Sequence, residues 1–513
     1  MTPTTPPLPQ DGGWRRTHPR TLLVHATWPL PPLASLTAAA VATGGRIPPG
    51  TWITLATLTM SFAVVTAVGA VRWARTEFRV TGAALEVRTG VLTRRLRTVP
   101  LDRIRTVDLT ATPLHRVLRL TALRAGTAGD GSGVLALDAL PVAEAGRLRG
   151  ALLARAASGA VTDDPVLAHF SPRWLRYAPL TFWVVGGVLI AAGTVHRVLH
   201  GMGVDFWELG FVRRAFAAFG TVSPWLTVPA ALLVLLAAGA VGAVALYAEN
   251  WWHHRLEWAD ASTLRVRRGL FTTRTVTVDR ARLRGVLLRE PLLLRAGGGA
   301  AVRAVAGGLG DRDENRARSG LLPPAPRALA VRVAGGALRA PFPDPPLPGR
   351  GVPATLVRHP RAALRRRRLR GLLWVTLPGT ALSAGCGVAF APVLLPWAGA
   401  YAVVSAGVVW WAARAAYRAL GHGLCGGHLV VRSGVFSRDT LALERSAVAA
   451  WTFSSTPFGR RAGLVTLTAA FAAGEGRHRI PDLAAARAPG FAAATAPGIV
   501  EEFLVGADGG GRR

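Results

Sequence analysis

The longest stretch of this sequence without a charged residue runs from Gly371 to Ala413 and holds 43 residues. As a single helix it would be roughly 65 Å long, about twice the hydrocarbon thickness of a bilayer. Pro392 and Pro396 lie in its middle. Because proline interrupts a helix, we predict that the stretch turns there and forms a hairpin of two transmembrane helices.

Similar apolar runs near the N-terminus and in the middle of the chain predict two more hairpins. Residues 21–45 and 47–71 flank a single Arg46, and residues 177–195 and 215–248 lie on either side of a tip with aromatic and charged residues. Six runs of this length are typical of an integral membrane α-helical protein and not of buried soluble helices. The expected transmembrane hairpins span 21–72, 175–248 (with an extracytoplasmic loop at 198–223) and 371–413.

The distribution of arginine predicts which side of the membrane each segment occupies. The formal net charge is +33, and all 61 Lys+Arg residues are arginine. Of these, 57 lie before, between or after the hairpins and 4 lie in the hairpin tips. Positively charged flanking segments stay in the cytoplasm, so we expect a multi-pass plasma-membrane protein with both termini cytoplasmic. The cytoplasmic segments are a disordered tail at 1–20, domains at 73–160, 249–340 and 414–505, and a linker, Pro-rich then Arg-rich, at 341–370.

A nine-residue pattern recurs after each hairpin and predicts an internal repeat. The copies are LEVRTGVLT at 85–93, LRVRRGLFT at 264–272 and LVVRSGVFS at 429–437. The shared landmarks are the sixth residue of each copy, Gly90, Gly269 and Gly434, and a proline 22 or 23 residues later, Pro113, Pro291 and Pro457. Alternating apolar and polar residues before a glycine are typical of a β-strand that ends in a turn. We therefore expect three related β-rich domains.

Between these landmarks each copy carries an apolar residue, an acidic residue and an arginine: Leu101-Asp102-Arg103, Val278-Asp279-Arg280 and Leu443-Glu444-Arg445. A helical stretch that begins near a proline follows in each copy. These features resemble the bacterial pleckstrin-homology-like domain of multi-pass membrane proteins, a family formerly known as a domain of unknown function. The resemblance is closest to members with three such domains. It implies three small β-barrels, each closed by a C-terminal helix, and no catalytic residues.

Two arginine clusters are candidate contacts for anionic lipid headgroups. Arg365, Arg366, Arg367 and Arg368 precede the third hairpin, and Arg94, Arg95 and Arg97 follow the first repeat's glycine. Arginines beside a membrane attract anionic headgroups. A topology signal explains the first cluster as well, and a solvated strand face explains the second. No aromatic residues that could stack on bases interleave with them, so we expect no nucleic-acid binding.

No catalytic motif, metal site or cofactor site is predicted. The glycine-rich runs lack the lysine of a phosphate-binding loop, and His422, Cys425 and His428 lack a fourth metal ligand. We expect a non-enzymatic membrane scaffold that binds lipid headgroups or a protein partner, with a role in envelope maintenance or stress resistance. Small residues in the spans would also allow a homo-oligomer. The alternative is a transporter or channel component, although the spans contain no acidic residue or arginine in their interiors.

Overall fold

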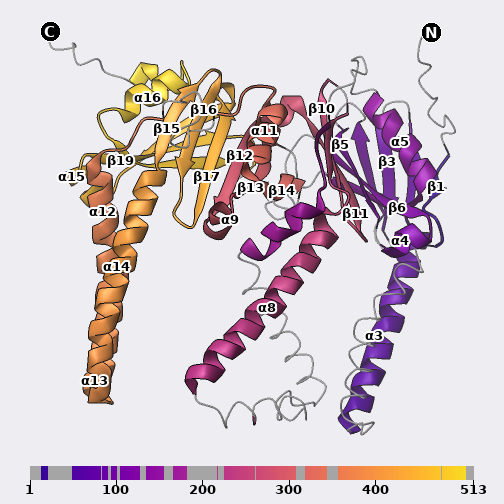
Figure 1. Ribbon diagram of the computed structural model, residues 1–513. Coiled ribbons are helices and arrows are strands. Elements are labelled where there is room, and N and C mark those ends of the chain that lie inside the picture. The colour runs from indigo at the N-terminus through magenta and orange to yellow at the C-terminus, as the bar shows by residue number, and fades with distance from the viewer. Residues whose placement is uncertain are drawn as a thin grey trace. The chain divides into compact units, whose positions relative to one another are not determined.

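The computed structural model consists of two compact units, Met1–Asp279 and Arg280–Arg513. Figure 1 shows that each unit combines β-sheets with helices that extend away from them. The residues that the structure describes are 13–20, 49–81, 84–90, 94–100, 104–111, 113–127, 134–154, 166–181, 217, 224–259, 261–307, 318–343, 356–474 and 476–503.

Three helical segments among the described residues are long and apolar enough to cross a membrane: Pro229–Trp251, Arg361–Ala389 and Leu395–Ala419. A shorter apolar segment, Thr59–Ala74, lies in helix α3 (Pro49–Ala74). The prediction of six clear transmembrane helices is therefore supported only in part. The other predicted segments lie outside the described residues: the apolar runs at 21–45 and 182–195, and the loop at 198–223 apart from Ala217.

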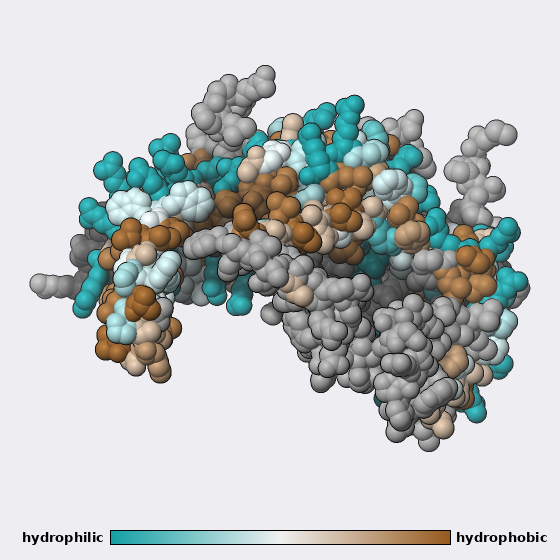
Figure 2. Space-filling model, turned by 60° about the horizontal axis from the view of Figure 1, so that its bottom comes forward, coloured by the Kyte–Doolittle hydropathy of each residue, from teal (hydrophilic) through white to brown (hydrophobic). Residues whose placement is uncertain are grey.

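The third hairpin is described along its whole length. Its elements are α12 (Arg361–Gly371), the π-helical segment η5 (Leu372–Thr376), α13 (Leu377–Ala389), the 3₁₀ turn η6 (Pro392–Leu394) and α14 (Leu395–Ala419). The chain reverses at Pro392, where the ring blocks a helical hydrogen bond. Figure 2 shows hydrophobic residues on the surface of this hairpin, at the left of the view. Side chains such as Trp374 and Phe390 are 79% and 84% exposed.

The described residues of unit 1 form two sheets. The four-stranded sheet has the order β1-β2-β3-β4, and the seven-stranded sheet has the order β7-β6-β5-β11-β10-β9-β8. The strands are β1 (Arg15–Arg16), β2 (Glu77–Val80), β3 (Ala84–Thr89), β4 (Arg95–Pro100), β5 (Ile104–Ala111), β6 (Leu120–Thr127), β7 (Val134–Pro141), β8 (Val166–His169), β9 (Arg255–Trp258), β10 (Thr263–Arg268) and β11 (Thr273–Asp279). Besides α3, the helices described in this unit are α4 (Pro113–Val117), α5 (Val142–Ala154), the 3₁₀ helix η2 (Pro172–Leu180) and α8 (Pro224–Trp251).

Unit 2 is built in the same way. Its six-stranded sheet has the order β14-β13-β12-β17-β16-β15, and its three-stranded sheet has the order β18-β19-β20. The strands are β12 (Leu283–Pro291), β13 (Gly299–Ala306), β14 (Gly320–Pro326), β15 (Gly421–Cys425), β16 (His428–Ser433), β17 (Ser437–Glu444), β18 (Val448–Ser454), β19 (Leu464–Phe471) and β20 (Arg477–Ala484). The remaining helices are η4 (Arg280–Arg282), α9 (Leu292–Ala296), α11 (Arg327–Leu338), η7 (Arg445–Ala447), α15 (Pro457–Arg461), α16 (Ala488–Thr495) and η8 (Glu501–Phe503).

Each hydrophobic core lies between two sheets and a helix. In the first repeat, side chains of β2–β4, β6, β7 and α5 form one buried cluster, which includes Leu85, Leu123 and Leu148. In the third repeat, strands β16–β20 and helix α16 form another, which includes Leu443, Leu467 and Ala492. Burial of aliphatic side chains on both sheets holds each pair of sheets together.

The large sheets join neighbouring repeats, and this arrangement corrects the expected barrels. Strand β5 of the first repeat pairs with β11 of the second, and β12 of the second repeat pairs with β17 of the third. The seven-residue β12–β17 register runs from Gly285 opposite Leu443 to Pro291 opposite Ser437. The strand edge that would close a barrel within one repeat therefore pairs with the next repeat. The described strands form open sheets, and the prediction of closed barrels is wrong.

The repeat landmarks have matching backbone geometry. Gly90, Gly269 and Gly434 have φ values of +126°, +115° and +119°, which side-chain-bearing residues rarely adopt. A Cβ atom on Gly269 would lie 1.9 Å from the carbonyl oxygen of Thr272. The second landmark, proline, begins or directly precedes the short helices α4, α9 and α15. Glycine is thus required by the hairpin turn itself.

Three segments have more structure than the sequence predicts. In the tail at 1–20, Arg15 and Arg16 form β1 and pair with Phe78 and Glu77 of β2. The Arg-rich half of the linker at 341–370 is helix α12, which continues into the hairpin. The beginning of the predicted second hairpin at 175 is 3₁₀ helix η2, whose side chains of Trp174, Tyr177 and Ala178 are buried.

Candidate anion-binding pocket

A cavity of about 760 Å³ lies in unit 1, on one face of the seven-stranded sheet. Its floor is formed by residues of β5, β9, β10 and β11. Its wall is formed by residues of α4, the turn after it, the start of β6 and the start of α5. The lining residues are Leu109, Ala111, Arg116, Arg119, Leu120, Thr121, Val142, Arg255, Glu257, Arg265, Arg267, Thr273 and Thr275. The pocket therefore combines side chains of the first and the second repeat.

Strand alternation directs the arginines of β10 to this face. Leu264 and Val266 are buried on the core side, so Arg265 and Arg267 point to the opposite side. Residues that face each other on paired strands share a side of the sheet, and Arg267 lies opposite Thr275. The same alternation that builds the core thus collects guanidinium groups and threonine hydroxyls on the outer face.

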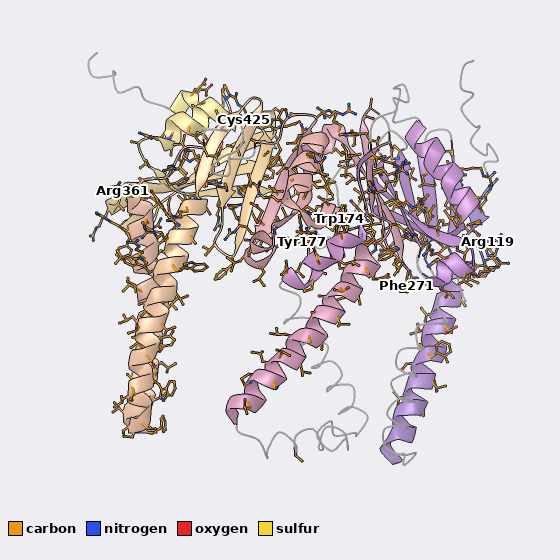
Figure 3. All side chains as sticks on the ribbon, viewed as in Figure 1. Arg119, Trp174, Tyr177, Phe271, Arg361 and Cys425 are labelled. Atoms are coloured by element: carbon orange, nitrogen blue, oxygen red, sulfur yellow. The ribbon has the colours of Figure 1, made fainter. Side chains whose placement is uncertain are left out.

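The wall of the pocket is held by an arginine from the first repeat. Arg116 Nη1 donates hydrogen bonds to the carbonyl oxygens of Leu270 at 2.6 Å and Phe271 at 3.3 Å. These carbonyls belong to the Gly269 turn, so the contact joins α4 to the hairpin of the second repeat. The next arginine, Arg119, has φ +55° and ends the turn in the left-handed conformation. Figure 3 labels Arg119 and Phe271 in this region.

One carboxylate partly balances the charge of the pocket. Glu257 accepts hydrogen bonds from Arg255 Nε at 2.5 Å and from Arg265 Nε at 2.8 Å. Partial burial opposes ionisation of Glu257, but the hydrogen bonds and charges of Arg265 and Arg255 outweigh it and lower the pKa of the carboxyl. Glu257 is therefore ionised at neutral pH, and the five lining arginines still exceed the single lining carboxylate by four charges.

Two arginines of the pocket remain available for a ligand. Within the described part of the chain, the side chains of Arg119 and Arg267 have no hydrogen-bond or ion-pair partner. Guanidinium groups form planar pairs of N–H donors that match phosphate and carboxylate oxygens. With the hydroxyls of Thr273 and Thr275 on the same face, the pocket offers both charge and hydrogen bonds to an anion.

The first predicted lipid-contact cluster is mostly engaged inside unit 2. Arg366 Nη1 pairs with Asp482 Oδ1, and Arg367 Nε donates to Asp482 Oδ2 at 3.1 Å. Arg368 lies over the Trp410 ring, with its guanidinium carbon 3.5 Å from the ring centroid. Arg365 is the exposed member of the cluster. The structure thus places Arg366 and Arg367 in contacts that attach the hairpin to the third repeat, and Arg368 in a contact between two helices of the hairpin itself.

The second predicted cluster lies along an open strand edge. Arg95 and Arg97 are exposed on β4, and Arg94 is exposed just before it. Among the described residues β4 pairs with β3 alone. Counted from the repeat glycines, Arg97 occupies the position of Val276 and Leu441, which are 5% and 2% exposed. Charged residues keep an open edge from pairing with other chains, so an exposed arginine at 97 is compatible with a structural role at this edge.

Sequence reasoning missed the pocket and a buried histidine pair. His359 Nδ1 donates to the carbonyl oxygen of Asp482 at 3.0 Å, and its Nε2 lies 3.1 Å from His422 Nδ1. Burial lowers the pKa of His422 to about 4, with contributions from His359 and Arg487. In the part of the chain that the structure describes, no group of three or more His, Cys, Asp or Glu residues could hold a metal ion. The alternating arginines of LRVRR were the available signal for the pocket.

A model of the family described as "Bacterial PH domain" matches the chain three times, over residues 31–156, 211–332 and 376–494. Each match begins inside a predicted hairpin and continues into the β-rich segment that follows. No curated protein and no solved structure matches the chain significantly. The matches cover well over half of the sequence and confirm the resemblance inferred from the three repeats. This chain belongs to the bacterial PH domain family.

Proposed function

We propose that this protein is a non-enzymatic scaffold of the plasma membrane, in which the pocket of unit 1 binds phosphate-bearing headgroups of anionic lipids. The observation that carries the proposal is the excess of arginine over carboxylate in one cavity, with Arg119 and Arg267 unpaired among the described residues. Neighbouring PH-like repeats share sheets, so ligand binding at the junction would also stabilise their mutual arrangement.

Membrane insertion rests on the apolar helices. Helices α8, α13 and α14 expose large apolar side chains, such as Leu233 at 69% and Val403 at 75%. Exposed apolar surface of this extent is unfavourable in water and favourable in a bilayer. We add the two apolar runs that lie outside the described residues, at 21–45 and 182–195, and propose six transmembrane spans in three hairpins. The bias of arginine toward the segments between hairpins supports cytoplasmic domains and termini.

The position of the pocket suits a lipid ligand. Thr273, at one end of the pocket, directly follows residues 271–272, whose amides bind Glu249 in the last turn of α8. The pocket therefore begins where the proposed transmembrane helix ends. A domain tethered at this level meets headgroups of its own membrane at high effective concentration. Binding of a cytoplasmic protein partner remains part of the scaffold proposal.

The test uses the full chain in nanodiscs that contain phosphatidylcholine and phosphatidylglycerol, with native mass spectrometry of the retained lipids. The Arg119→Gln/Arg267→Gln variant is compared with Arg274→Gln, an exposed arginine of β11 that does not line the pocket. At about 1 kcal/mol for each arginine, the double variant should bind the anionic lipid roughly 30-fold more weakly. The control should retain it as the natural chain does.

Inorganic phosphate provides the second arm of the test. Competition by phosphate at millimolar concentration would show that a free anion is bound equally well, and the lipid assignment would be wrong. Equal lipid retention by the natural chain and the double variant would contradict a binding role for the pocket altogether.

A further inference from the structure

Large apolar side chains are exposed at the repeat landmarks. They are Val117 (79% exposed) on α4, Leu293 (54%) on α9, Phe458 (76%) on α15, and Phe271 (60%) and Phe436 (74%) after the hairpin glycines. Side chains of this size are usually buried in a water-soluble domain, and a single exposed one needs no explanation. Phe271 and Phe436 each lie two residues after the repeat glycine, and the other three lie on the corresponding short helices, which indicates a shared role.

The two kinds of landmark meet in each unit. In unit 1, Arg116 of α4 donates to the carbonyl oxygen of Phe271, so Val117 and Phe271 come from contacting segments. In unit 2, the amide nitrogen of Leu292 donates to the carbonyl oxygen of Phe436 at 2.6 Å. The hairpin turn of one repeat thus lies against the proline-initiated helix of the preceding repeat. Each contact therefore joins a segment with an exposed aromatic residue to a segment with an exposed aliphatic one.

These apolar pairs are attached to the ends of the proposed transmembrane helices. The amides of Phe271 and Thr272 each donate to the Glu249 carboxylate at 3.1 Å, in the last turn of α8. The amide of Gly269 also donates to the carbonyl oxygen of Trp252 at 2.8 Å. Figure 3 shows Phe271 at the end of unit 1 from which α3 and α8 extend.

The same attachment is found in unit 2. Arg432, two residues before the Gly434 turn, donates from Nε to the carbonyl oxygen of Ala419 at 3.2 Å, at the end of α14. On the other side, Arg366 of α12 donates to Thr456 Oγ1 at 3.0 Å, immediately before α15 and Phe458. The two contacts attach β16, which leads into the Gly434 turn, and the residue before α15 to the helices that form the third hairpin.

We propose that these landmark side chains insert into the interfacial region of the bilayer that the helices cross, and dock each domain against it. Aromatic and aliphatic residues at the level of the headgroups remove apolar surface from water while neighbouring arginines face anionic phosphates. The occupant of this surface is therefore the lipid interface itself and not a second protein. The inference rests on membrane anchoring, but it does not depend on ligand binding in the pocket.

The experiment places an environment-sensitive nitrobenzoxadiazole label on one cysteine at a time in the full chain. Phe271→Cys and Phe436→Cys are introduced after replacement of the native thiols, as Cys386→Ala and Cys425→Ser. Each variant is reconstituted at one copy per nanodisc. Quenching is measured with lipid that carries a nitroxide near the headgroup and, separately, with aqueous iodide.

The native cysteines supply matched controls. Cys386 lies in α13, and Cys425 lies at the end of β15, away from the end of unit 2 from which the hairpin extends (Figure 3). Labelled alone, Cys386 should be quenched by lipid-borne nitroxide if the hairpin is anchored. Labelled Cys425 should be quenched by iodide only.

Labels at 271 and 436 should be quenched several-fold more by lipid nitroxide than the label at 425, and less by iodide. Quenching of both by iodide to the extent seen at Cys425, while Cys386 responds to lipid, would overturn the inference and leave anchoring intact. Shielding from both quenchers would also overturn it, because another protein surface would then cover these residues. An absence of lipid quenching at Cys386 would reject anchoring itself. The Val117→Cys variant repeats the test on α4 in case a substitution at 271 disturbs folding.

Discussion

Arg438 donates two hydrogen bonds to Glu290, at 2.7 Å from Nε and 2.9 Å from Nη2. The arginine is the second residue of β17 in the third repeat, and the glutamate, 148 positions earlier, is the next-to-last residue of β12 in the second. Arg327 Nε donates to the same carboxylate at 2.8 Å, and Glu290 is 1% exposed. One buried carboxylate therefore joins two repeats at the edge where their strands pair.

The first prediction concerns this junction. Glu290→Gln should destabilise the pairing of β12 with β17 by about 3 kcal/mol, because it removes the buried negative charge that Arg438 and Arg327 share. Hydrogen exchange of the amides in these strands measures the loss. The matched control is Glu444→Gln, which breaks a more exposed pair with Arg284 at 3.6 Å and should cost less than about 1 kcal/mol. Equal effects of the two variants would contradict the assigned role of Glu290.

The junction should also respond to acid. Burial opposes ionisation of Glu290, but Arg438 and Arg327 outweigh it and lower the pKa of its carboxyl below the ordinary value of 4.5. This carboxylate therefore contributes stability above that value, and the contribution is lost as pH falls through the pKa of the folded state. Glu290→Gln should remove this part of the acid sensitivity of β12 and β17.

A second pH dependence, at higher pH, should come from the histidine pair. Burial lowers the pKa of His422 from 6.5 to about 4, so the unfolded chain binds a proton in this interval that the folded chain does not. Stability of the third repeat should thus fall as pH decreases from 6.5 to 4, by at most roughly 3 kcal/mol. His422→Gln should flatten the profile of exchange rates in β15 between these pH values. If the exchange rates of the His422→Gln variant changed with pH as steeply as those of the natural chain, His422 would not be the source of this pH dependence.

The open edge of β4 provides a test of the role of Arg97. Arg97→Val restores the apolar residue found at the equivalent buried positions, Val276 and Leu441, on an edge that lacks a partner among the described strands. The variant should self-associate, since an uncharged apolar edge strand readily pairs with another chain. Size-exclusion chromatography in detergent measures the change, and Arg97→Lys should elute as the natural chain does. A monodisperse Arg97→Val variant would show that charge at 97 does not protect the edge.

The repeats and their landmarks could be predicted because they depend on local chemistry. Gly90, Gly269 and Gly434 each have a positive φ angle that favours glycine at that position. Pro392 lies at the turn of the hairpin, where a proline interrupts the helix. The strand pairing between repeats could not be predicted, because alternation fixes which face a strand buries and not which edge it joins.

The candidate site could not be predicted either, because it also depends on which repeats lie against each other. The arginines of β10 are visible in the sequence, but their pocket exists because α4 of another repeat lies against the Gly269 turn. Conversely, the dense cluster at 365–368 suggested lipid binding, whereas Asp482, more than a hundred residues later, engages Arg366 and Arg367. Charge density alone does not distinguish a free arginine from a paired one.

The central claim is that apolar hairpins hold the three repeats at the cytoplasmic face of the membrane, and side-specific thiol labelling tests it most directly. Ala449→Cys, on the exposed part of β18, and Gly201→Cys, in the loop predicted to be extracytoplasmic, are each introduced into a chain without native cysteines. A membrane-impermeant maleimide applied to intact bacterial cells should label position 201 at once and position 449 after permeabilisation only. Labelling of position 449 in intact cells would contradict the account.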